Sequence, residues 1–408
     1  MTRQSNQLQL ATSRYFGLGL VWRLQKVRRL LSRLARASDS AWTSSIRAWH
    51  RLHPPPIAAS VLDWCQRTSH LPYEILLTPE PVHRKLPQTV EPEIHERYLK
   101  RLYYTPPVKY LTCIPGARLT GNTGWLVLPT GQYALELAYG TPLHLMVDAD
   151  FTGPRPKRRL RMAGNYYSLL MLWARDGSYY HWVHDVMLRL AGILPRLPAD
   201  VRFVVPANLA PYQRECLQAV GIEADRLVHY TGREEWIIER LYFSPPSAIT
   251  GYDLPEADRW FRQRVREAYN VAPSKPSRRI FITRRASRGR SITNETDVEA
   301  YLRPLGFETI ALEGLTFAQQ VALFAEAKIV VGSHGAGFTN ILFANAGLQV
   351  VECFEPGYVN TCFWTMSEAL NLRYAYFMGR TVPAPGTDAN IEVPIDKLRA
   401  TLAACGCV

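Results

Sequence analysis

Short apolar runs alternate with amphipathic segments over residues 169–230. An uninterrupted apolar run is typical of a strand buried on both faces, whereas apolar residues spaced by three or four positions are typical of a helix. The pattern predicts strands at 169–173, 201–205 and 226–230, and helices at 181–193 and 211–220. Such alternation favours a layered α/β fold with parallel strands.

A second, longer alternation follows the proline-rich stretch 244–246. It predicts strands at 279–283, 308–311, 328–331, 349–353 and 373–377. It predicts helices at 253–269, 295–303, 316–326, 338–344, 361–370 and 394–403. The first of these helices connects the two series. We therefore expect two Rossmann-like domains facing a cleft, an N-terminal α/β domain at 57–252 and a C-terminal domain at 253–408.

The chain before these series is less regular. Residues 57–150 show no sustained period and predict irregular structure with short strands at 124–128 and 133–137. Residues 1–56 form a separate segment that ends in three prolines. In the stretch 16–36 the following apolar positions recur every three or four residues: Leu20, Leu24, Val27, Leu31 and Leu34. Arginine and lysine fill the other side, which predicts a basic amphipathic helix.

Two uses of that helix stay open. It fits the anionic surface of a membrane, which residues 14–36 would contact through their Lys and Arg side chains. It also fits an ordinary helix that packs on the body of the protein with a solvated charged face. Most of the formal net charge of +13 comes from this segment, because residues 1–53 hold ten Lys and Arg against one acid. The remaining chain is nearly balanced, which gives no reason to expect a nucleic-acid partner.

The cysteines and the hydropathy point to a reducing compartment. Seven cysteines are scattered along the chain without a C-x-x-C pair, so we expect buried free thiols. No apolar run reaches the roughly 18 residues of a transmembrane helix, and the start lacks the pattern of a signal peptide. These features predict a cytoplasmic protein.

A glycine-rich loop follows the strand predicted at 328–331. It reads Gly332-Ser333-His334-Gly335-Ala336-Gly337 and continues into Phe338, Thr339 and Asn340. Glycines let the backbone approach a ligand closely, and the first N–H groups of the next helix favour an anion. One alternative is a dinucleotide fingerprint, with Glu352 as the ribose-binding acid, but its G-x-G-x-x-G order is not present and the loop follows the third strand of its series. A purely structural turn is the other alternative.

An arginine-rich loop follows the strand predicted at 279–283. Four arginines lie between Arg284 and Arg290, at the strand end where open α/β sheets bind ligands. Guanidinium groups suit diphosphate oxygens, and we choose Arg284 and Arg290 as the contacts. Asn294 and Glu295 are expected to cap or anchor the loop, and the other arginines to be solvated.

A third cluster lies at the start of the helix predicted at 181–193. His181 and Asp185 are four residues apart and share a helix face, and His184 lies close to both. A carboxylate beside imidazoles can accept a proton from a hydroxyl group. The alternative for each histidine is a satisfied, partly buried side chain. The Asp148-Ala149-Asp150 stretch has the D-x-D form of a metal–diphosphate site, but two nearby acids are common, and we assign no metal ligand.

These three motifs, in this order, resemble glycosyltransferase family 61. The segments that carry the resemblance are Tyr179-Tyr180-His181-Trp182 with Asp185, Ile282-Thr283-Arg284 with Arg290 and Asn294-Glu295, and the glycine loop through Asn340. The resemblance spans roughly residues 165–380. It implies a GT-B fold, here with the basic amphipathic segment as an N-terminal appendage, and an inverting transfer from a nucleotide sugar.

The resemblance also assigns roles to residues. His181, His184 and Asp185 form the catalytic group, with Asp185 as the base oriented by either histidine and the identity of the base left open. The expected contacts to the nucleotide sugar are Arg284, Arg290, Asn294, His334, Gly335, Ala336, Gly337, Phe338, Thr339, Asn340 and Glu352. No cofactor and no essential divalent metal are implied.

The function that we expect is transfer of a sugar, usually from a UDP-sugar, to a hydroxyl of a glycan or lipid-linked glycan in capsular or other cell-surface polysaccharide synthesis. The protein would lie in the cytoplasm, peripheral to the inner face of the plasma membrane. Two other classes stay open: a Rossmann-type NAD or FAD oxidoreductase, and a non-catalytic protein that binds a membrane surface or nucleic acid.

Overall fold

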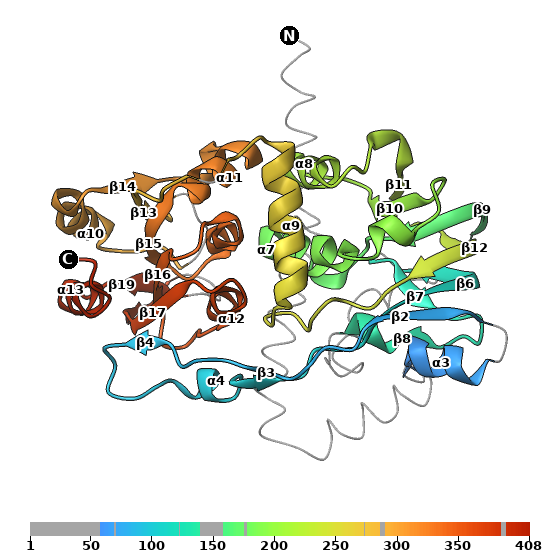
Figure 1. Ribbon diagram of the computed structural model, residues 1–408, viewed down its shortest axis with the longest axis horizontal. Helices are drawn as coiled ribbons and strands as arrows, with labels where there is room; N and C mark the ends of the chain where they lie inside the picture. The colour runs from blue at the N-terminus through green and yellow to red at the C-terminus, as the bar shows by residue number, and fades with distance from the viewer. Residues whose placement is uncertain are drawn as a thin grey trace, which may run out of the picture. The chain divides into compact units, whose positions relative to one another are not determined.

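The computed structural model of the chain describes residues 58–68, 71–121, 123–138, 158–174, 178–272, 274–285, 290–384 and 389–408. The amphipathic helix predicted at 16–36 and the Asp148/Asp150 pair lie outside the described residues. The remaining chain has helices and strands in both halves, as Figure 1 shows, and this confirms the α/β fold class. None of the described helices is long and apolar enough to cross a membrane.

The second predicted series forms a parallel sheet. Its strands, in spatial order, are β14 (Phe307–Ile310), β13 (Arg278–Ile282), β15 (Ala327–Ser333), β16 (Gln349–Phe354), β17 (Arg373–Met378) and β4 (Gln88–Thr89). All neighbours pair in parallel, as the strand–helix alternation predicted. Uninterrupted β-branched and aromatic runs such as Ile280–Ile282 and Ile329–Val331 suit strands that are covered on both faces.

Strand β4 belongs to the stretch that the sequence predicted as irregular. It pairs with β17 at the edge of the parallel sheet. The neighbouring segment adds side-chain contacts: Glu91 lies 2.8 Å from Lys397 Nζ, and the hydroxyl groups of Tyr98 and Tyr374 are 3.0 Å apart. The chain thus visits this sheet before the C-terminal half begins, and the predicted division between residues 252 and 253 stays a prediction.

The first sheet differs from the expectation. Its path runs β1 (Ala58–Ala59), β8 (Tyr133–Ala134), β7 (Trp125–Val127), β6 (Lys109–Thr120), β12 (Glu235–Phe243), β9 (Arg159–Ser168), β10 (Arg202–Pro206) and β11 (Leu227–Tyr230), with β2 (Tyr73–Leu77) on β6. Pairing is parallel from β12 to β11 but antiparallel around β6. The expected Rossmann-like parallel sheet is therefore wrong for this half.

Two features explain the difference. The stretch 57–150 is predicted to be irregular, yet Pro115 and Gly116 lie within β6, where Pro115 pairs with Arg240 beside an irregularity in β12. The apolar run 169–173 predicts a strand, but the strand is β9, and Leu172–Ala174 form a 3-10 turn. Strand β9 begins with alternating polar and apolar residues, Arg159–Met162, and continues through Gly164 and Asn165, so it has no continuous apolar run.

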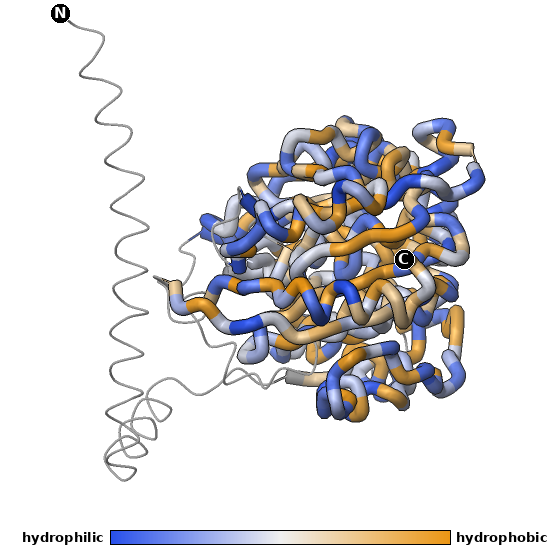
Figure 2. Tube along the Cα trace, turned by 90° about the vertical axis from the view of Figure 1, so that its left-hand side faces the viewer, coloured by the Kyte–Doolittle hydropathy of each residue, from blue (hydrophilic) through white to orange (hydrophobic). Residues whose placement is uncertain are grey.

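Helices cover the sheets. They are α3 (Val61–Arg67), α4 (Glu96–Leu99), α8 (Pro211–Ala219), α9 (Pro255–Ala268), α10 (Glu295–Leu302), α11 (Phe317–Ala325), α12 (Cys362–Ala369) and α13 (Ile395–Ala404). The predicted helix 338–344 is the 3-10 helix η9 (Ala336–Phe343), against which α9 packs through Phe261 and Phe343. Figure 2 shows apolar stretches through the interior and hydrophilic ones over the outside. All seven cysteines are free thiols, as expected, and six are buried.

The helix predicted at 181–193 is irregular and ends earlier. Residues Tyr179–His181 form the short α7, Trp182–Val186 follow as a π-helical turn, and Met187–Leu190 as a 3-10 turn. A π-helical turn inside a helix is rare and frequent at functional sites, because it redirects side chains relative to a regular helix. Five consecutive side chains, from Trp182 to Val186, are buried here.

Candidate active site

Two of the predicted motifs lie where the topology of the parallel sheet changes direction. Strands β13 and β15 are neighbours, although β14 lies between them in sequence and pairs on the far side of β13. The connections from β13 and from β15 therefore leave in opposite directions, and this is the topology at which open α/β sheets form a ligand-binding crevice at the carboxyl ends of the strands. We refer to this edge of the sheet as the crevice. The arginine loop leaves β13 at this edge, and the glycine loop leaves β15.

Arg284 lies directly against the glycine loop. A Cβ built at Gly335 would overlap with its Nη1 and come 2.9 Å from its Cζ. Gly337 is also restricted, because a Cβ there would come 2.8 Å from Leu312. The Arg284 guanidinium therefore occupies the space that a side chain at Gly335 would take, so the two predicted motifs are in direct contact.

The C-terminal end of the glycine loop is partly accessible to solvent. Ala336 is exposed and Gly337 is half-buried at the start of η9. The first N–H groups of a helix have no partner within the helix and favour negative charge. The predicted anion contacts at Ala336 and Gly337 therefore have the required access.

His334 is buried at the start of the same loop. Its Nδ1 lies 2.5 Å from Oε1 of Glu352, and its ring stacks on Phe354 at 5.2 Å. Tyr374 donates its hydroxyl to the other carboxylate oxygen, Oε2, at 2.5 Å. Glu352 has no exposed surface and both oxygens occupied, so it orients His334. The expected contact between Glu352 and the ribose or base is not available in this arrangement.

Arg290 reaches the same area from the far end of the arginine loop. Its guanidinium lies 4.7 Å from the ring centroid of Tyr358, a cation–π distance, and Tyr358 is 5.6 Å from the ring of His334. Arg290 has a φ of 55°, in the left-handed region that few non-glycine residues adopt. Tyr358 was not predicted, because it lies in a loop after β16 without a motif around it.

Asn294 has a different role from the expected ligand contact. Its Nδ2 donates to the Val393 carbonyl at 2.9 Å, and its Oδ1 accepts from the Val393 N–H at 2.9 Å. The side-chain amide is therefore used in anchoring the loop to the chain before α13. Glu295 is buried and accepts from the Thr283 hydroxyl, which fits its predicted anchoring role.

Three further predicted contacts lie behind the glycine loop. Phe338, Thr339 and Asn340 are buried in η9, with exposed fractions of at most 1 %. Asn340 accepts a hydrogen bond from the Tyr179 hydroxyl at 2.6 Å and donates to Gln320 at 2.8 Å. These residues support the loop from inside and do not line its accessible side.

The histidine cluster is centred on Asp185. Its Oδ2 lies 2.7 Å from Nδ1 of His181, and its Oδ1 lies 2.8 Å from Nδ1 of His184. Asp185 is only 2 % exposed, whereas the side chain of His181 keeps 27 % of its surface. Burial alone would raise the pKa of Asp185, but the hydrogen bonds from His181 and His184 outweigh it and lower the pKa. A buried carboxylate thus holds two imidazoles.

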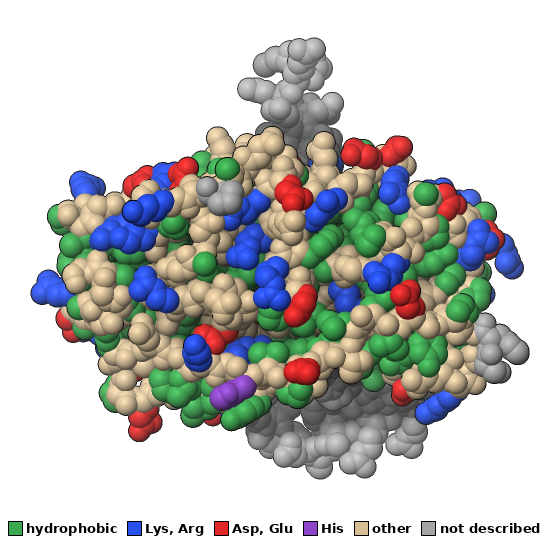
Figure 3. All heavy atoms as spheres, in the orientation of Figure 1, with side chains coloured by type: hydrophobic (Ala, Val, Ile, Leu, Met, Phe, Trp, Pro, Cys, Tyr) green, Lys and Arg blue, Asp and Glu red, His purple; other side chains and the backbone are tan. Residues whose placement is uncertain are grey.

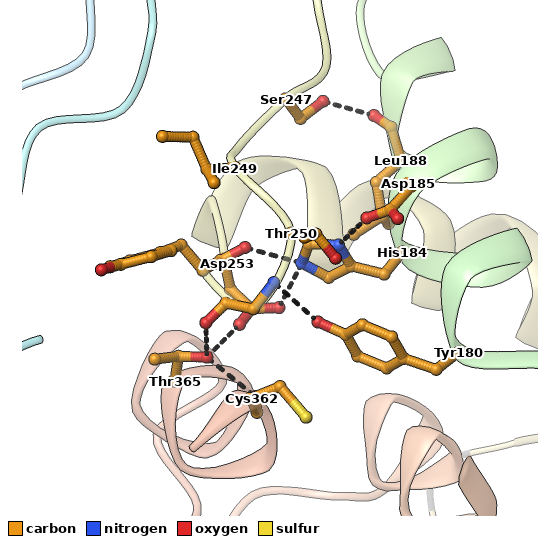
Figure 4. A network of polar contacts seen from close by, with 12 residues as sticks. Tyr180, His184, Asp185, Leu188, Ser247, Ile249, Thr250, Asp253, Cys362 and Thr365 are labelled. Carbon is orange, nitrogen blue, oxygen red and sulfur yellow. Dashed lines mark hydrogen bonds and ion pairs between the residues drawn. The ribbon is translucent and has the colours of Figure 1, made fainter. Parts of the chain in front are cut away.

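His184 lies deeper, between two carboxylates, as Figure 4 shows. Its Nε2 is 2.6 Å from the Tyr252 carbonyl oxygen and 3.2 Å from Oδ1 of Asp253. Burial alone would lower the pKa of His184, but Asp253 and Asp185 outweigh it and raise the pKa well above 6.5. Both ring nitrogens face acceptors, which is the geometry of an imidazolium that donates twice.

Asp253 is tied to the second half of the chain. Its Oδ2 accepts a hydrogen bond from Thr365 of α12 at 2.7 Å. Asp253 and Thr365 were not predicted, since they lie far from the motif in sequence and only the fold brings them to it. Trp173 was also missed: its ring is 48 % exposed and its centroid lies 6.2 Å from the ring of His181.

Stacked rings join the histidine cluster to the glycine loop. Tyr180 stacks on His184 at 5.0 Å, and Phe363 packs on Tyr180 at 5.7 Å and on His334 at 5.3 Å. The bond between Tyr179 and Asn340 runs beside this stack. The structure therefore brings the three predicted motifs into one neighbourhood.

Metal ligands are a separate question. Among the described residues, no three His, Cys, Asp or Glu side chains lie together so that they could hold a metal ion. Cationic groups at the crevice come instead from Arg284 and Arg290. That a divalent metal is not essential stays a prediction.

Comparison with known proteins supports the resemblance. The sequence model of the family Glycosyltransferase 61 matches residues 179–351. The matched range begins at Tyr179, covers the histidine cluster, the arginine loop and the glycine loop, and ends one residue before Glu352. No curated protein matches the chain. The family match favours the transferase over the oxidoreductase and the non-catalytic binding protein that the sequence left open. The chain therefore carries the glycosyltransferase 61 domain that its motifs resemble, and it is a glycosyltransferase.

Proposed function

We propose that this glycosyltransferase moves a sugar from a nucleotide-sugar donor, a UDP-sugar, to a hydroxyl group of a glycan or lipid-linked glycan with inversion at the anomeric carbon. The observation that supports this proposal is the pairing of two chemistries within one neighbourhood. An imidazole held by a buried carboxylate lies on one side, and an arginine–glycine crevice for a diphosphate lies on the other.

The donor binds through its diphosphate at the carboxyl ends of β13 and β15. Arg284 and Arg290 come from the arginine loop, and the N–H groups at Ala336 and Gly337 come from the start of η9. Guanidinium forks match diphosphate oxygens in geometry and charge. They stabilise the charge that develops on the leaving diphosphate, which we expect to supply the larger share of catalysis.

His181 is the general base in our proposal, and Asp185 orients it. Asp185 is buried with both oxygens occupied, so it has no oxygen free for an acceptor hydroxyl. Its bond to Nδ1 of His181 fixes the tautomer in which Nε2 is the proton acceptor, the same division of labour as in a Ser-His-Asp triad. His184 has both nitrogens engaged and holds Asp185 in place.

The step is a single displacement. Nε2 of His181 takes the proton of the acceptor hydroxyl while its oxygen forms a bond to the anomeric carbon. The bond from that carbon to the diphosphate oxygen breaks on the opposite face, and its electron pair leaves with the nucleoside diphosphate. Trp173 offers an exposed aromatic ring beside His181, a surface on which the apolar face of an acceptor sugar can lie.

The remaining assignments rest on the family. We propose a GT-B arrangement, a role in capsular or other cell-surface polysaccharide synthesis, and a position in the cytoplasm at the inner face of the plasma membrane. No cofactor is proposed, because the arginines supply positive charge at the diphosphate. Surface attachment through residues 14–36 is part of the same proposal and rests on their charge pattern.

Thermal unfolding with a panel of ligands tests the donor class. The full chain is heated with UDP, GDP, CMP, dTDP, NAD or FAD, with and without manganese. A ligand at about 100 times its dissociation constant adds ~2.7 kcal/mol of stability, which shifts Tm by a few degrees. We expect UDP to stabilise the protein and Arg284→Ala to abolish the shift. Stabilisation by NAD or FAD alone would overturn the proposal.

A kinetic comparison tests the base. We expect His181→Gln to lower kcat by roughly 10²–10⁴-fold with unchanged UDP binding. Full activity of this variant would contradict the assignment of His181 as the general base.

A further inference from the structure

Helix α9 lines a pocket that the catalytic proposal does not use. Arg259, Arg262 and Arg266 form one wall, and residues 344–346 after η9 and 369–371 after α12 form the other. The cavity volume is about 270 Å³. Lys and Arg side chains gather over α9 in the middle of the face that Figure 3 shows. We call this cavity the arginine pocket.

The three arginines are not matched by carboxylates inside the pocket. Arg262 Nη1 donates to the Ala344 carbonyl at 3.3 Å, and Arg266 Nη1 donates to the Asn345 side chain at 2.7 Å. Arg259 reaches Glu256 on the exposed side of α9 at 3.4 Å. A guanidinium has five N–H donors, so most donors of Arg259 and Arg262 have no partner among the described residues.

Like charges are close together here. Burial lowers the pKa of Arg262, and the nearby charge of Arg266 lowers it further. The carboxyl group of Asp258, which lies behind Arg262, is fully buried, and burial raises its pKa well above 3.8, so it offers little negative charge. The cluster therefore carries net positive charge at a partly buried position, because its one carboxylate partner within the described ranges is Glu256, in an exposed ion pair with Arg259.

A wider hollow of about 580 Å³ lies on the other side of Arg262 and Arg266. Glu267 lines that hollow, which makes it a poorer place for an anion than the arginine pocket. We therefore choose the arginine pocket as the anion site over this hollow, on the basis of charge alone.

The arginine pocket is distinct from the crevice at the glycine loop. Residues 344–346 precede β16 and residues 369–371 precede β17, so the pocket lies at the amino ends of these strands. The crevice lies at the carboxyl ends, on the other edge of the sheet. Helix η9 runs between them, with Ala336 at the crevice and Ala344 at the pocket.

We propose that the arginine pocket binds a phosphate-bearing anion, either free phosphate or diphosphate or the phosphate of a lipid headgroup. Guanidinium groups bind phosphate oxygens in bidentate fashion, and Arg259 and Arg262 supply the available donors here. Arg266 adds positive charge, because its nitrogens already donate to Asn345 and to the Val271 and Ala272 carbonyls. A pocket just below the ~300–1,000 Å³ of small-molecule sites holds a phosphate or diphosphate group and not a whole nucleotide.

Pyrophosphate binding tests the proposal. All proteins in the experiment are full-length and carry Arg284→Gln, so that pyrophosphate at the crevice does not dominate. Isothermal titration compares this background with Arg259→Gln/Arg262→Gln and with Arg264→Gln. Arg264 lies on α9 near Glu267 and outside the pocket, so its replacement removes a positive charge from the same helix without changing the pocket. Circular dichroism of each variant shows that α9 is retained.

We expect the pocket variant to bind pyrophosphate at least tenfold more weakly than the background, and Arg264→Gln to differ by less than about twofold. Equal affinity of the pocket variant and the background overturns the proposal. An equal loss in Arg264→Gln also overturns it, because the effect would then be one of overall charge.

Vesicles of phosphatidylcholine with and without phosphatidylglycerol separate the two sources of phosphate. If the pocket variant loses binding to the anionic vesicles relative to Arg264→Gln, the ligand is a lipid headgroup. If both variants bind these vesicles equally while the pocket variant loses pyrophosphate, the ligand is a free anion. Neither result depends on the transferase mechanism, so failure here and failure of the proposed function are distinguishable.

Discussion

The guanidinium of Arg284 fills the space that a side chain at Gly335 would occupy. A larger residue at this position would push the guanidinium away, whereas the backbone sets no limit, because the φ of Gly335 is 179° and any residue can adopt it. The proposed diphosphate site depends on this contact, since it places Arg284 beside the start of η9.

We expect Gly335→Ala to displace Arg284 and to weaken nucleotide binding by roughly tenfold, the loss of about one charge-assisted contact. Equilibrium binding of the stabilising nucleoside diphosphate measures it. Gly314→Ala is the matched control, because a Cβ at Gly314 meets no atom within 4 Å. Unchanged affinity in Gly335→Ala would show that Arg284 does not hold the ligand.

Asp185→Asn should lower kcat by about 10³–10⁴-fold with little change in nucleotide affinity. An amide at this position can donate to His181 Nδ1 and so favours the wrong tautomer of the base. Steady-state kinetics and nucleotide titration of the same samples separate the two effects. Asp200→Asn serves as a control, since Asp200 is exposed and contacts Asn165 instead. A loss of both kcat and folding would leave only a structural role for Asp185.

Tyr179→Phe should lower the free energy of unfolding by about 0.5–1.5 kcal/mol, the net value of a typical hydrogen bond, here the bond to Asn340. Tyr212 gives a matched control. Its ring packs on that of Tyr179 at 5.1 Å, but its buried hydroxyl has no partner among the described residues. Tyr212→Phe should therefore be neutral or stabilising. Urea unfolding of both variants checks the difference, and equal losses would contradict it.

The buried carboxyl group of Asp258 should make the free energy of unfolding depend on pH. It is fully buried, neither of its oxygens has a hydrogen-bond partner in the described part of the chain, and burial together with Asp253 raises its pKa well above 3.8. Above pH 3.8 the folded protein keeps a proton that the unfolded chain has released. The free energy of unfolding therefore falls as the pH rises, up to the folded-state pKa.

Asp258→Asn removes this titration. Between about pH 5 and about pH 7 we expect the variant to lose less stability than the wild type, by up to about 1.4 kcal/mol per pH unit. Urea unfolding at several pH values measures the slope. His184, whose pKa is also raised, contributes a further fall as the pH rises above 6.5 in both proteins. Parallel curves for the two proteins would contradict the prediction.

The parallel sheet could be predicted because its signals are local. Apolar runs such as Ile280–Ile282 and Ile329–Val331 mark buried strands, and parallel strands share an edge, so the loops after β13 and β15 had to meet. The first sheet could not be predicted, because Pro115 and Gly116 are residues typical of turns, although β6 continues through them. Within the site, the motifs located His181, Arg284 and Gly335.

What the motifs did not reveal depends on the fold. Asp253 contacts His184, which lies 69 residues earlier in the chain, so no local sequence pattern predicts the contact. The sequence also did not indicate that Glu352 is buried, because its spacing from Gly332 is the same as that of a ribose-binding acid. Only the packing of Tyr374 and His334 around its carboxylate shows that it faces the protein.

Strand β4 sets a condition on how this enzyme can be made. Residues 88 and 89 leave the ribosome long before β17, their partner, has been synthesised. The edge of the parallel sheet therefore closes only when the chain is nearly complete, and such long-range pairing slows folding. Until then β4 has no partner, and an unpaired strand can pair with another chain. The yield of folded enzyme should consequently depend on protection of this strand during translation.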